Sequence, residues 1–316
     1  ISDLTGIGAF SVLTALNCYN NNLSSLDVSH NKDLEELNFG NNSIASLNVS
    51  QNPYLKVLWG ENNKLTSLDV SQNVNLIVLG VAYNLISSIN VSENPNLISF
   101  ACANNMLTSL DLSENPKLIR LWCGANQLST LDISKQINLE LLECSNIPLI
   151  SLDLSANTKL QSLFCFNNQF TDLDLSKNKN LIYLDCHDNQ FDSLNLTKNI
   201  LLDTLICFNN QLTSFDFAAN YKLSYLNCSN NMLTSLDVSK NNSLNHLICT
   251  DNNLTSLDIT ANKSLFELNC SRNQLSSLIS NNMQLLYLRC SDNKFSSLDL
   301  SKNTSLITVD CTNNSL

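Results

Sequence analysis

The feature that most constrains the fold of this chain is a 21-residue repeat that runs through almost all of its 316 residues. Leucines recur at this spacing from Leu13 to Leu265, and Leu285 and Leu306 continue the series after one interval of 20 residues. We place this single deletion between Leu278 and Ile279. Because repeated units bury their apolar faces against their neighbours, about fifteen such units predict a solenoid.

Each unit follows the pattern L-x-x-L-x-C-x-x-N-x-L-x-x-L-D-V-S-x-N-x-x. The period of two in L-x-x-L-x-C predicts a short strand whose second Leu and Cys point inward, so that stacked units form a concave parallel sheet. The later T-S-L-D-V-S segment also alternates, which predicts a second row of short convex strands instead of helices. We therefore expect one mainly β solenoid domain over residues 1–316, with no terminal cap visible at either end.

Two asparagine columns accompany the leucines. The first follows the cysteine position, as in Asn42, and the second follows the convex serine, as in Asn52. A buried amide is stable only when it is hydrogen-bonded, so both columns are expected to bind the backbone of neighbouring units. The first column is interrupted where Ile147 replaces Asn and Pro148 removes a backbone N–H, which predicts a local irregularity there.

All 12 cysteines occupy the same inward strand position, which Phe39, Gly60 and Val81 fill in three other units. A position that accepts such different residues serves packing, where free Cys behaves as a small apolar side chain. Side chains stacked at about 4.8 Å lie outside the usual disulfide range, and no zinc-type C-x-x-C pair is present. We expect reduced core thiols and no metal or other cofactor.

A catalytic constellation is not visible in the sequence. His187 follows Asp185 by two residues on one strand, but the neighbouring units offer Phe166 and Phe208 at the matching positions. No activated nucleophile or third ligand accompanies the pair, which predicts a polar point inside a binding surface instead of an enzyme. The Asp of L-D-V-S is expected to cap a local turn, because Asn replaces it in units such as that of Asn90.

Charge limits the class of partner. Seventeen Lys and Arg against 28 Asp and Glu give a net charge of −11. This balance disfavours nucleic acid, whose binding depends on cationic side chains that release counterions. No apolar run approaches the roughly 18 residues of a spanning helix, so direct membrane insertion is not expected.

The outward strand positions change character along the chain, and this change identifies the candidate partner-binding surface. They are mostly small, polar or aliphatic in the first five units, with Trp59 as the exception. The expected surface on the concave face consists of Trp122, Leu141, Phe164, Phe166, Tyr183, His187, Ile206, Phe208, Tyr225, His246 and Ile248. Contiguous exposed aromatic surface usually marks an interaction site. The alternative is that these rings only pack on one another across neighbouring strands.

The repeat unit resembles the leucine-rich repeat, and its Cys-bearing form is similar to that of internalin-like bacterial proteins. The resemblance implies a scaffold whose concave sheet binds a protein partner, as an adhesin or receptor does, outside the cell or at the bacterial cell surface. It transfers no catalytic residue. The alternative function is carbohydrate or peptide capture as an accessory of an outer-membrane nutrient importer. The chain is expected to be monomeric or part of a larger surface complex.

Overall fold

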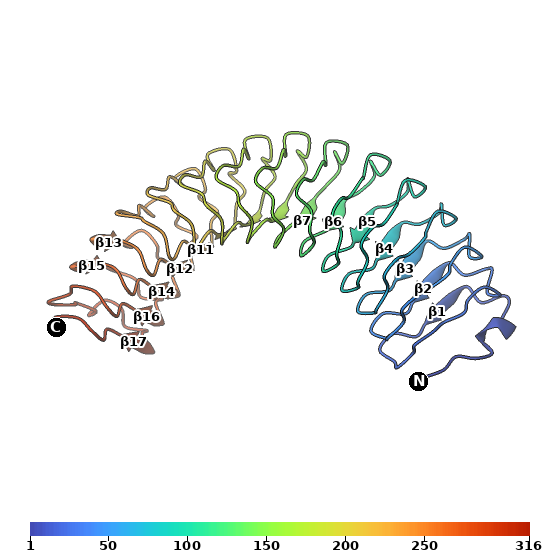
Figure 1. Ribbon diagram of the computed structural model, residues 1–316. Coiled ribbons are helices and arrows are strands. Elements are labelled where there is room, and N and C mark those ends of the chain that lie inside the picture. The colour runs from blue at the N-terminus through green and yellow to red at the C-terminus, as the bar shows by residue number, and fades with distance from the viewer. The chain divides into compact units, whose positions relative to one another are not determined.

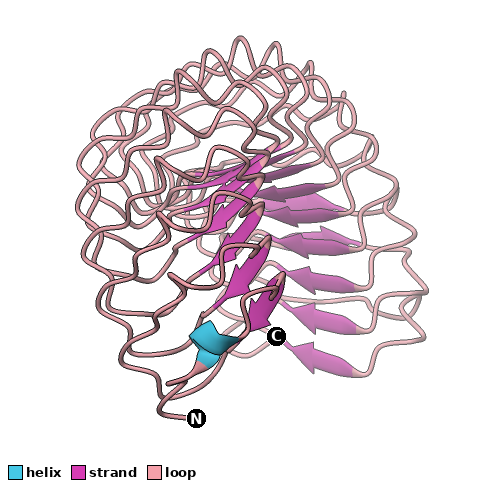
Figure 2. Ribbon diagram, turned by 90° about the vertical axis from the view of Figure 1, so that its right-hand side faces the viewer, coloured by secondary structure: helices cyan, strands magenta, loops and turns pink.

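The computed structural model describes all 316 residues, which form two compact units, Ile1–Thr158 and Lys159–Leu316. In each unit, every repeat contributes one short strand to a parallel sheet, and the rest of the repeat returns as turns and extended segments (Figures 1 and 2). Within each unit the strands lie on the inner side of the curve. The expected β solenoid with a concave parallel sheet is therefore confirmed for each unit.

The first unit begins with a single turn of 3-10 helix, η1 (Ile7–Ala9). Its sheet contains β1 (Ala15–Asn17), β2 (Glu36–Asn38), β3 (Val57–Trp59), β4 (Val78–Gly80), β5 (Ser99–Ala101), β6 (Arg120–Trp122) and β7 (Leu141–Glu143). Neighbouring strands pair in parallel with their central residues aligned, as Leu37 is with Leu58. The sequence spacing thus becomes a column of buried leucines.

The structure has no helix that could span a membrane.

The main sheet of the second unit contains eight strands: β8 (Ser162–Phe164), β9 (Tyr183–Asp185), β10 (Thr204–Ile206), β11 (Tyr225–Asn227), β12 (His246–Ile248), β14 (Glu267–Asn269), β16 (Tyr287–Arg289) and β17 (Thr308–Asp310). The expected second row of strands is reduced to one separate pair, β13 (Ser256–Asp258) and β15 (Ser277–Ile279). The carboxylate of the convex Asp accepts the backbone N–H two residues later both in the paired strand β13, where Asp258 accepts from Thr260 at 2.8 Å, and in unpaired repeats, where Asp237 accepts from Ser239 at 2.9 Å. This Asp therefore caps a local turn, as expected, and the predicted second row of strands is wrong for most repeats.

The deletion lies later in the repeat than the sequence indicated. Ile279 is aligned with Asp258 and is 53% exposed, while the next residue, Ser280, is buried. Ser280 therefore takes the inward position that Ile259 fills in the preceding repeat, and the missing residue belongs to the turn between Ser280 and Asn282. Our placement of the gap before Ile279 was wrong. The Ser280 hydroxyl compensates in part, because it accepts a 2.8 Å hydrogen bond from Asn303.

The cysteine column packs in the core. Eleven of the 12 cysteines are buried, Cys311 is half-buried, and all are free thiols. Burial raises the pKa of buried thiols such as Cys18, and to about 12 for Cys228 and Cys290. The thiolate form of these buried cysteines is therefore disfavoured, which suits a packing role.

The asparagine columns form the expected ladders. Asn189 Nδ2 donates to the carbonyl of Cys165 in the preceding repeat at 3.0 Å and to that of Cys186 at 3.2 Å. Its Oδ1 accepts from the Phe170 N–H at 3.1 Å. In the second column, Asn220 Nδ2 donates to two carbonyls of the preceding repeat at 2.8 and 3.1 Å. Each amide thus joins two consecutive repeats.

Candidate recognition surface

All eleven residues predicted for the surface occupy outward positions and are half-buried, whereas the leucines and cysteines between them are buried. Trp122 and Leu141 belong to the first unit, on β6 and β7. The other nine belong to the second unit, and we call them the aromatic face: Phe164, Phe166, Tyr183, His187, Ile206, Phe208, Tyr225, His246 and Ile248. Their alternation with buried residues confirms that period two sets the direction of these side chains.

The centre of the aromatic face is a stack of three rings from consecutive repeats. The His187 ring lies 4.4 Å from that of Phe166 and 4.3 Å from that of Phe208, measured between ring centroids. The interplanar angles are 10° and 16°, so the three rings are almost parallel. Strand spacing alone brings them to this distance, because each follows the inward cysteine of its repeat.

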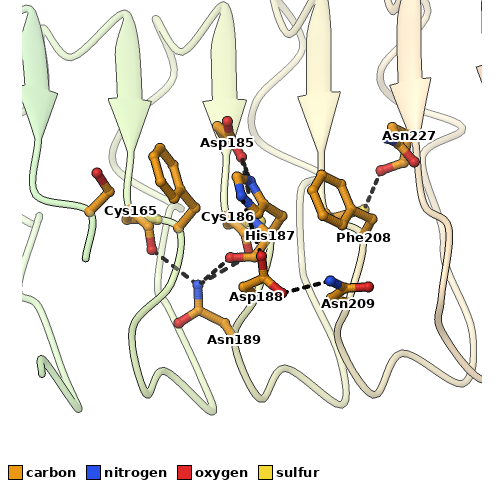
Figure 3. A network of polar contacts seen from close by, with 12 residues as sticks. Cys165, Asp185, Cys186, His187, Asp188, Asn189, Phe208, Asn209 and Asn227 are labelled. Carbon is orange, nitrogen blue, oxygen red and sulfur yellow. Dashed lines mark hydrogen bonds and ion pairs between the residues drawn. The ribbon is translucent and has the colours of Figure 1, made fainter. Parts of the chain in front are cut away.

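A polar network fixes the edge of the His187 ring (Figure 3). Its Nδ1 lies 2.5 Å from Asp185 Oδ1, and its Nε2 lies 3.5 Å from Asp188 Oδ2. Asp188 in turn accepts a 2.7 Å hydrogen bond from Asn209 on the next repeat. Burial raises the pKa of the Asp185 carboxyl, although the hydrogen bond from His187 opposes this shift. Both ring nitrogens of His187 therefore face carboxylate oxygens, which hold the ring in the stack.

Further ring pairs extend along the same sheet. Phe164 and Tyr183 lie 4.7 Å apart, and Tyr225 and His246 lie 5.8 Å apart. The row continues through residues that the sequence did not select: Phe266 lies 5.7 Å from His246 and 5.3 Å from Tyr287. Phe266 was missed because it precedes the outward strand position by one residue. Tyr287 does occupy an outward position, but the expected surface ended at Ile248.

Carboxylates lie on and close to the strands of this region. Between residues 161 and 251 they are Asp185, Asp188 and Asp251, with Asp203 just before β10, and no Lys or Arg lies on these strands or within three residues after them. The lysines of this stretch lie in the segments between the convex serine and the next strand. Carboxylates therefore adjoin the aromatic rings, and the last of them, Asp251, is paired with Arg272 of the next repeat at 3.6 Å.

The His187 imidazole is enclosed by packed rings. Rings cover both faces of the His187 imidazole, and the structure contains no group of three or more His, Cys, Asp or Glu residues that could hold a metal ion.

In the first unit, Trp59 lies against Gly80, where an added Cβ would be 2.1 Å from the indole ring. That ring packs on the sheet, and Trp122 and Leu141 lie several repeats farther along.

Comparison with known proteins gives related structures but few related sequences. No protein-family model matches the chain, and a search of curated proteins finds no match. Among solved structures, the functional domain of InlJ from Listeria monocytogenes, described as including a cysteine ladder, is 33% identical with a TM-score of 0.92. The alignment covers 96% of this chain and 68% of that one.

Two further structures share the fold. A leucine-rich repeat protein of Leptospira interrogans is 24% identical with a TM-score of 0.91, over 99% of this chain and 88% of that one. The plant peptide hormone receptor RGFR1, solved in complex with RGF2, is 23% identical with a TM-score of 0.81, over 98% of this chain and 57% of that one. The similarity to InlJ extends to the cysteine column, which is the feature that sets this repeat apart.

Proposed function

Because this chain belongs to the internalin-like bacterial leucine-rich repeat proteins, we propose that it is a non-catalytic scaffold that recognises a protein partner through its aromatic face. The observation that carries the proposal is the half-exposed Phe166, His187 and Phe208 stack on consecutive strands. Aromatic side chains are frequent anchors in interfaces, and rings that are already ordered lose little freedom on binding.

The core beneath these rings is complete without them, which supports the proposal. The inward leucines and cysteines beneath them, such as Leu184, Cys186 and Leu205, are fully buried and fill the core without them. Rings stacked on the outside of a complete core leave a contiguous apolar surface, which soluble proteins seldom expose unless it is used. The carboxylates close to the rings, Asp185, Asp188 and Asp203, add selectivity for a partner.

We further propose a location outside the cell or at the bacterial surface, as the resemblance of the repeat unit implies. In such a place the scaffold acts as an adhesin or receptor. Carbohydrate capture is the alternative, since the same rings can stack on sugars, and it becomes one outcome of the test below.

The test is a selection of random phage-displayed peptides on the immobilised chain, followed by titration of the selected peptides. The double variant Phe166→Ser/Phe208→Ser should weaken their binding at least 30-fold, because loss of a central anchor costs about 2 kcal/mol or more. The matched control is Ile200→Ser/Tyr221→Ser, which removes two exposed apolar side chains from return segments of the same unit. It should bind as the wild type does.

Circular dichroism and the urea midpoint establish that both double variants are folded. The proposal fails if the peptides bind the Phe166→Ser/Phe208→Ser variant as tightly as the wild type. A glycan array read with the same proteins tests the alternative. Glycan binding that the same double variant loses, without any selected peptide, would assign the surface to carbohydrate.

A further inference from the structure

Two tyrosines of the aromatic face flank a small residue. Thr204 on β10 is aligned with Tyr183 on β9 on one side and with Tyr225 on β11 on the other. Since adjacent strands lie about 4.8 Å apart, the two tyrosines are separated by about 10 Å along the sheet. Thr204 does not extend as far as either ring, so the inner side of each tyrosine is left without an aromatic neighbour.

The outer side of each tyrosine is already occupied. Phe164 lies 4.7 Å from the Tyr183 ring, and His246 lies 5.8 Å from the Tyr225 ring. Phe164 lies diagonally from Tyr183, because Ser162 is the residue aligned with Tyr183, whereas His246 is directly aligned with Tyr225. A cationic group midway between the two tyrosines would lie about 5 Å from each ring, within the roughly 6 Å at which a cation is attracted to an aromatic face.

Carboxylates adjoin this position from two strands. The Thr204 hydroxyl donates to Asp203 Oδ2 at 3.2 Å, and Asp203 is half-buried and forms no ion pair. Asp185 lies on β9, beside the tyrosines: the pKa of Tyr183 is raised by burial and then by the Asp185 charge, and that of Tyr225 by burial, Glu267 and Asp185. Asp203, which has no cationic partner, and Asp185, which is bonded to His187, thus bring carboxylate oxygens beside the two tyrosine rings, whereas Glu267 is paired with Arg289.

We infer that Tyr183, Thr204 and Tyr225, with Asp185 and Asp203, form a subsite for a Lys or Arg side chain of the partner polypeptide. The inference rests on the proposed function and names the chemistry of the partner. A cationic side chain gains from both ring faces and from the carboxylates, whereas an acidic side chain is repelled. The neighbouring ring stack at His187 then receives an apolar side chain of the same segment.

The test uses a fluorescein-labelled decapeptide of alternating lysine and glycine, titrated by fluorescence anisotropy at physiological salt. The same peptide with every lysine acetylated is the first control, because acetylation removes the charge and keeps the chain. We expect it to bind at least tenfold more weakly. Tyr183→Leu/Tyr225→Leu should lose at least tenfold in affinity, while Tyr183→Phe/Tyr225→Phe, which keeps both rings, should stay within about threefold of the wild type.

A charge control separates this subsite from the general attraction of an acidic chain. Asp174 is an exposed convex carboxylate of the same unit, so Asp174→Asn changes the net charge by the same amount as Asp203→Asn. Asp203→Asn should weaken binding clearly more. The inference is overturned if the two variants weaken it equally, if the acetylated peptide binds as tightly as the free one, or if the lysine peptide does not bind.

The outcome is distinguishable from failure of the proposed function. Phage-selected peptides could lose binding to Phe166→Ser/Phe208→Ser but bind Tyr183→Leu/Tyr225→Leu normally. This result would support the recognition surface and refute the cationic subsite. Peptides that are insensitive to both double variants would refute the proposed function itself.

Discussion

The ring of Phe39 occupies the space in which a side chain at position 60 would lie, because a Cβ atom added to Gly60 would be 2.1 Å from Phe39 Cζ. Both residues stand in the inward column that cysteine fills in most repeats. A large side chain in one repeat is thus accommodated by the absence of one in the next. The side-chain size that is allowed at position 60 therefore depends on the residue at position 39 in the preceding repeat.

This pairing predicts strong coupling in a double-mutant cycle. Gly60→Cys alone should destabilise the chain by about 1–3 kcal/mol through overpacking. Phe39→Cys alone should cost about 2–4 kcal/mol because it leaves a cavity. The double variant extends the cysteine column through both repeats, so its loss should be smaller than the sum by at least about 1 kcal/mol. Urea unfolding of the four proteins measures the coupling, and simple additivity would contradict it.

The repeat of Ile147 should exchange its amides faster than its neighbours. In the preceding repeat Leu107 N–H donates to Asn126 Oδ1, and the Gln127 N–H donates to the Leu107 carbonyl. The equivalent bonds at Leu128 are not available, because residue 147 is Ile and Pro148 has no N–H. Hydrogen exchange should therefore be faster at Leu128 than at Leu107.

Ile147→Asn should restore the acceptor for Leu128 N–H and slow its exchange at least tenfold. Asn146 provides the matched control, because Asn146→Ser leaves residue 147 unchanged. Equal protection of Leu107 and Leu128 in the wild type would contradict the prediction.

The convex Asp residues should make the chain sensitive to acid. Hydrogen bonds from the Ser N–H and hydroxyl two residues later lower the pKa of Asp69, Asp111, Asp132, Asp174 and Asp237 below the ordinary value. A lowered folded-state pKa means that this stabilisation is present above the unfolded pKa of about 3.9 and is lost as the pH falls through the folded value.

Replacing Asp111, Asp132 and Asp174 together by Asn should reduce the fall in urea midpoint between pH 5 and pH 3. Asn keeps the acceptor, as Asn90 shows with a 3.0 Å bond from Ser92 N–H, but does not titrate. The exposed Asp192, which has no such backbone bond to a later Ser, supplies the control Asp192→Asn. An unchanged acid dependence in the triple variant would show that the turns do not set it.

Thiol accessibility should follow burial. Cys311 is half-buried and the other cysteines are buried, with raised pKa values for thiols such as those of Cys144 and Cys186. A thiol reagent at pH 8 should therefore label Cys311 first and the others slowly. Cys311→Ser should remove this fast phase. In denaturant without reductant, close to all 12 thiols should react. A denatured count near zero would mean that the column is oxidised in the isolated protein.

Backbone strain at Ala125 offers a stabilising substitution. Each repeat holds one residue in the left-handed region, usually Asn or Asp, and Ala125 does so with φ of 49°. This conformation costs most residues roughly 1–2 kcal/mol and is tolerated by Asn and Gly. Ala125→Asn should therefore raise the free energy of unfolding by about 0.5–1 kcal/mol. The reverse change, Asn104→Ala in the preceding repeat, should lower the free energy of unfolding. The explanation is ruled out if Ala125→Asn destabilises the chain or if Asn104→Ala stabilises it.

Sequence periodicity predicted the direction of the side chains on the concave strands. Leu163, Cys165 and Phe166 alternate inward and outward as period two requires, and the asparagine ladders follow from the need to satisfy buried amides. The sequence did not predict features that depend on contacts between repeats. The parallel stacking at His187 and the inclusion of Phe266 depend on side-chain rotamers in neighbouring repeats.

The convex side shows the other limit. Alternation there predicted strands, but only β13 and β15 pair, although the turn bond of the convex Asp is present both in β13, from Thr260 to Asp258, and elsewhere, from Ser239 to Asp237. The position of the deletion also required the structure, because Ile279 and Ser280 both fit an alternating pattern. Only the alignment with Asp258 shows which of them points outward.

The asparagine ladder also determines how the chain would respond to mechanical tension. Amides such as that of Asn126 join the main chain of one repeat to that of the preceding one, so a pulling force along the stack is shared between side chains and the sheet. At Ile147 this first column is interrupted, so only the sheet and the second column, through Asn157, carry the force there. If the chain binds a partner under flow, the repeat of Ile147 should therefore be the first to separate from the preceding repeat.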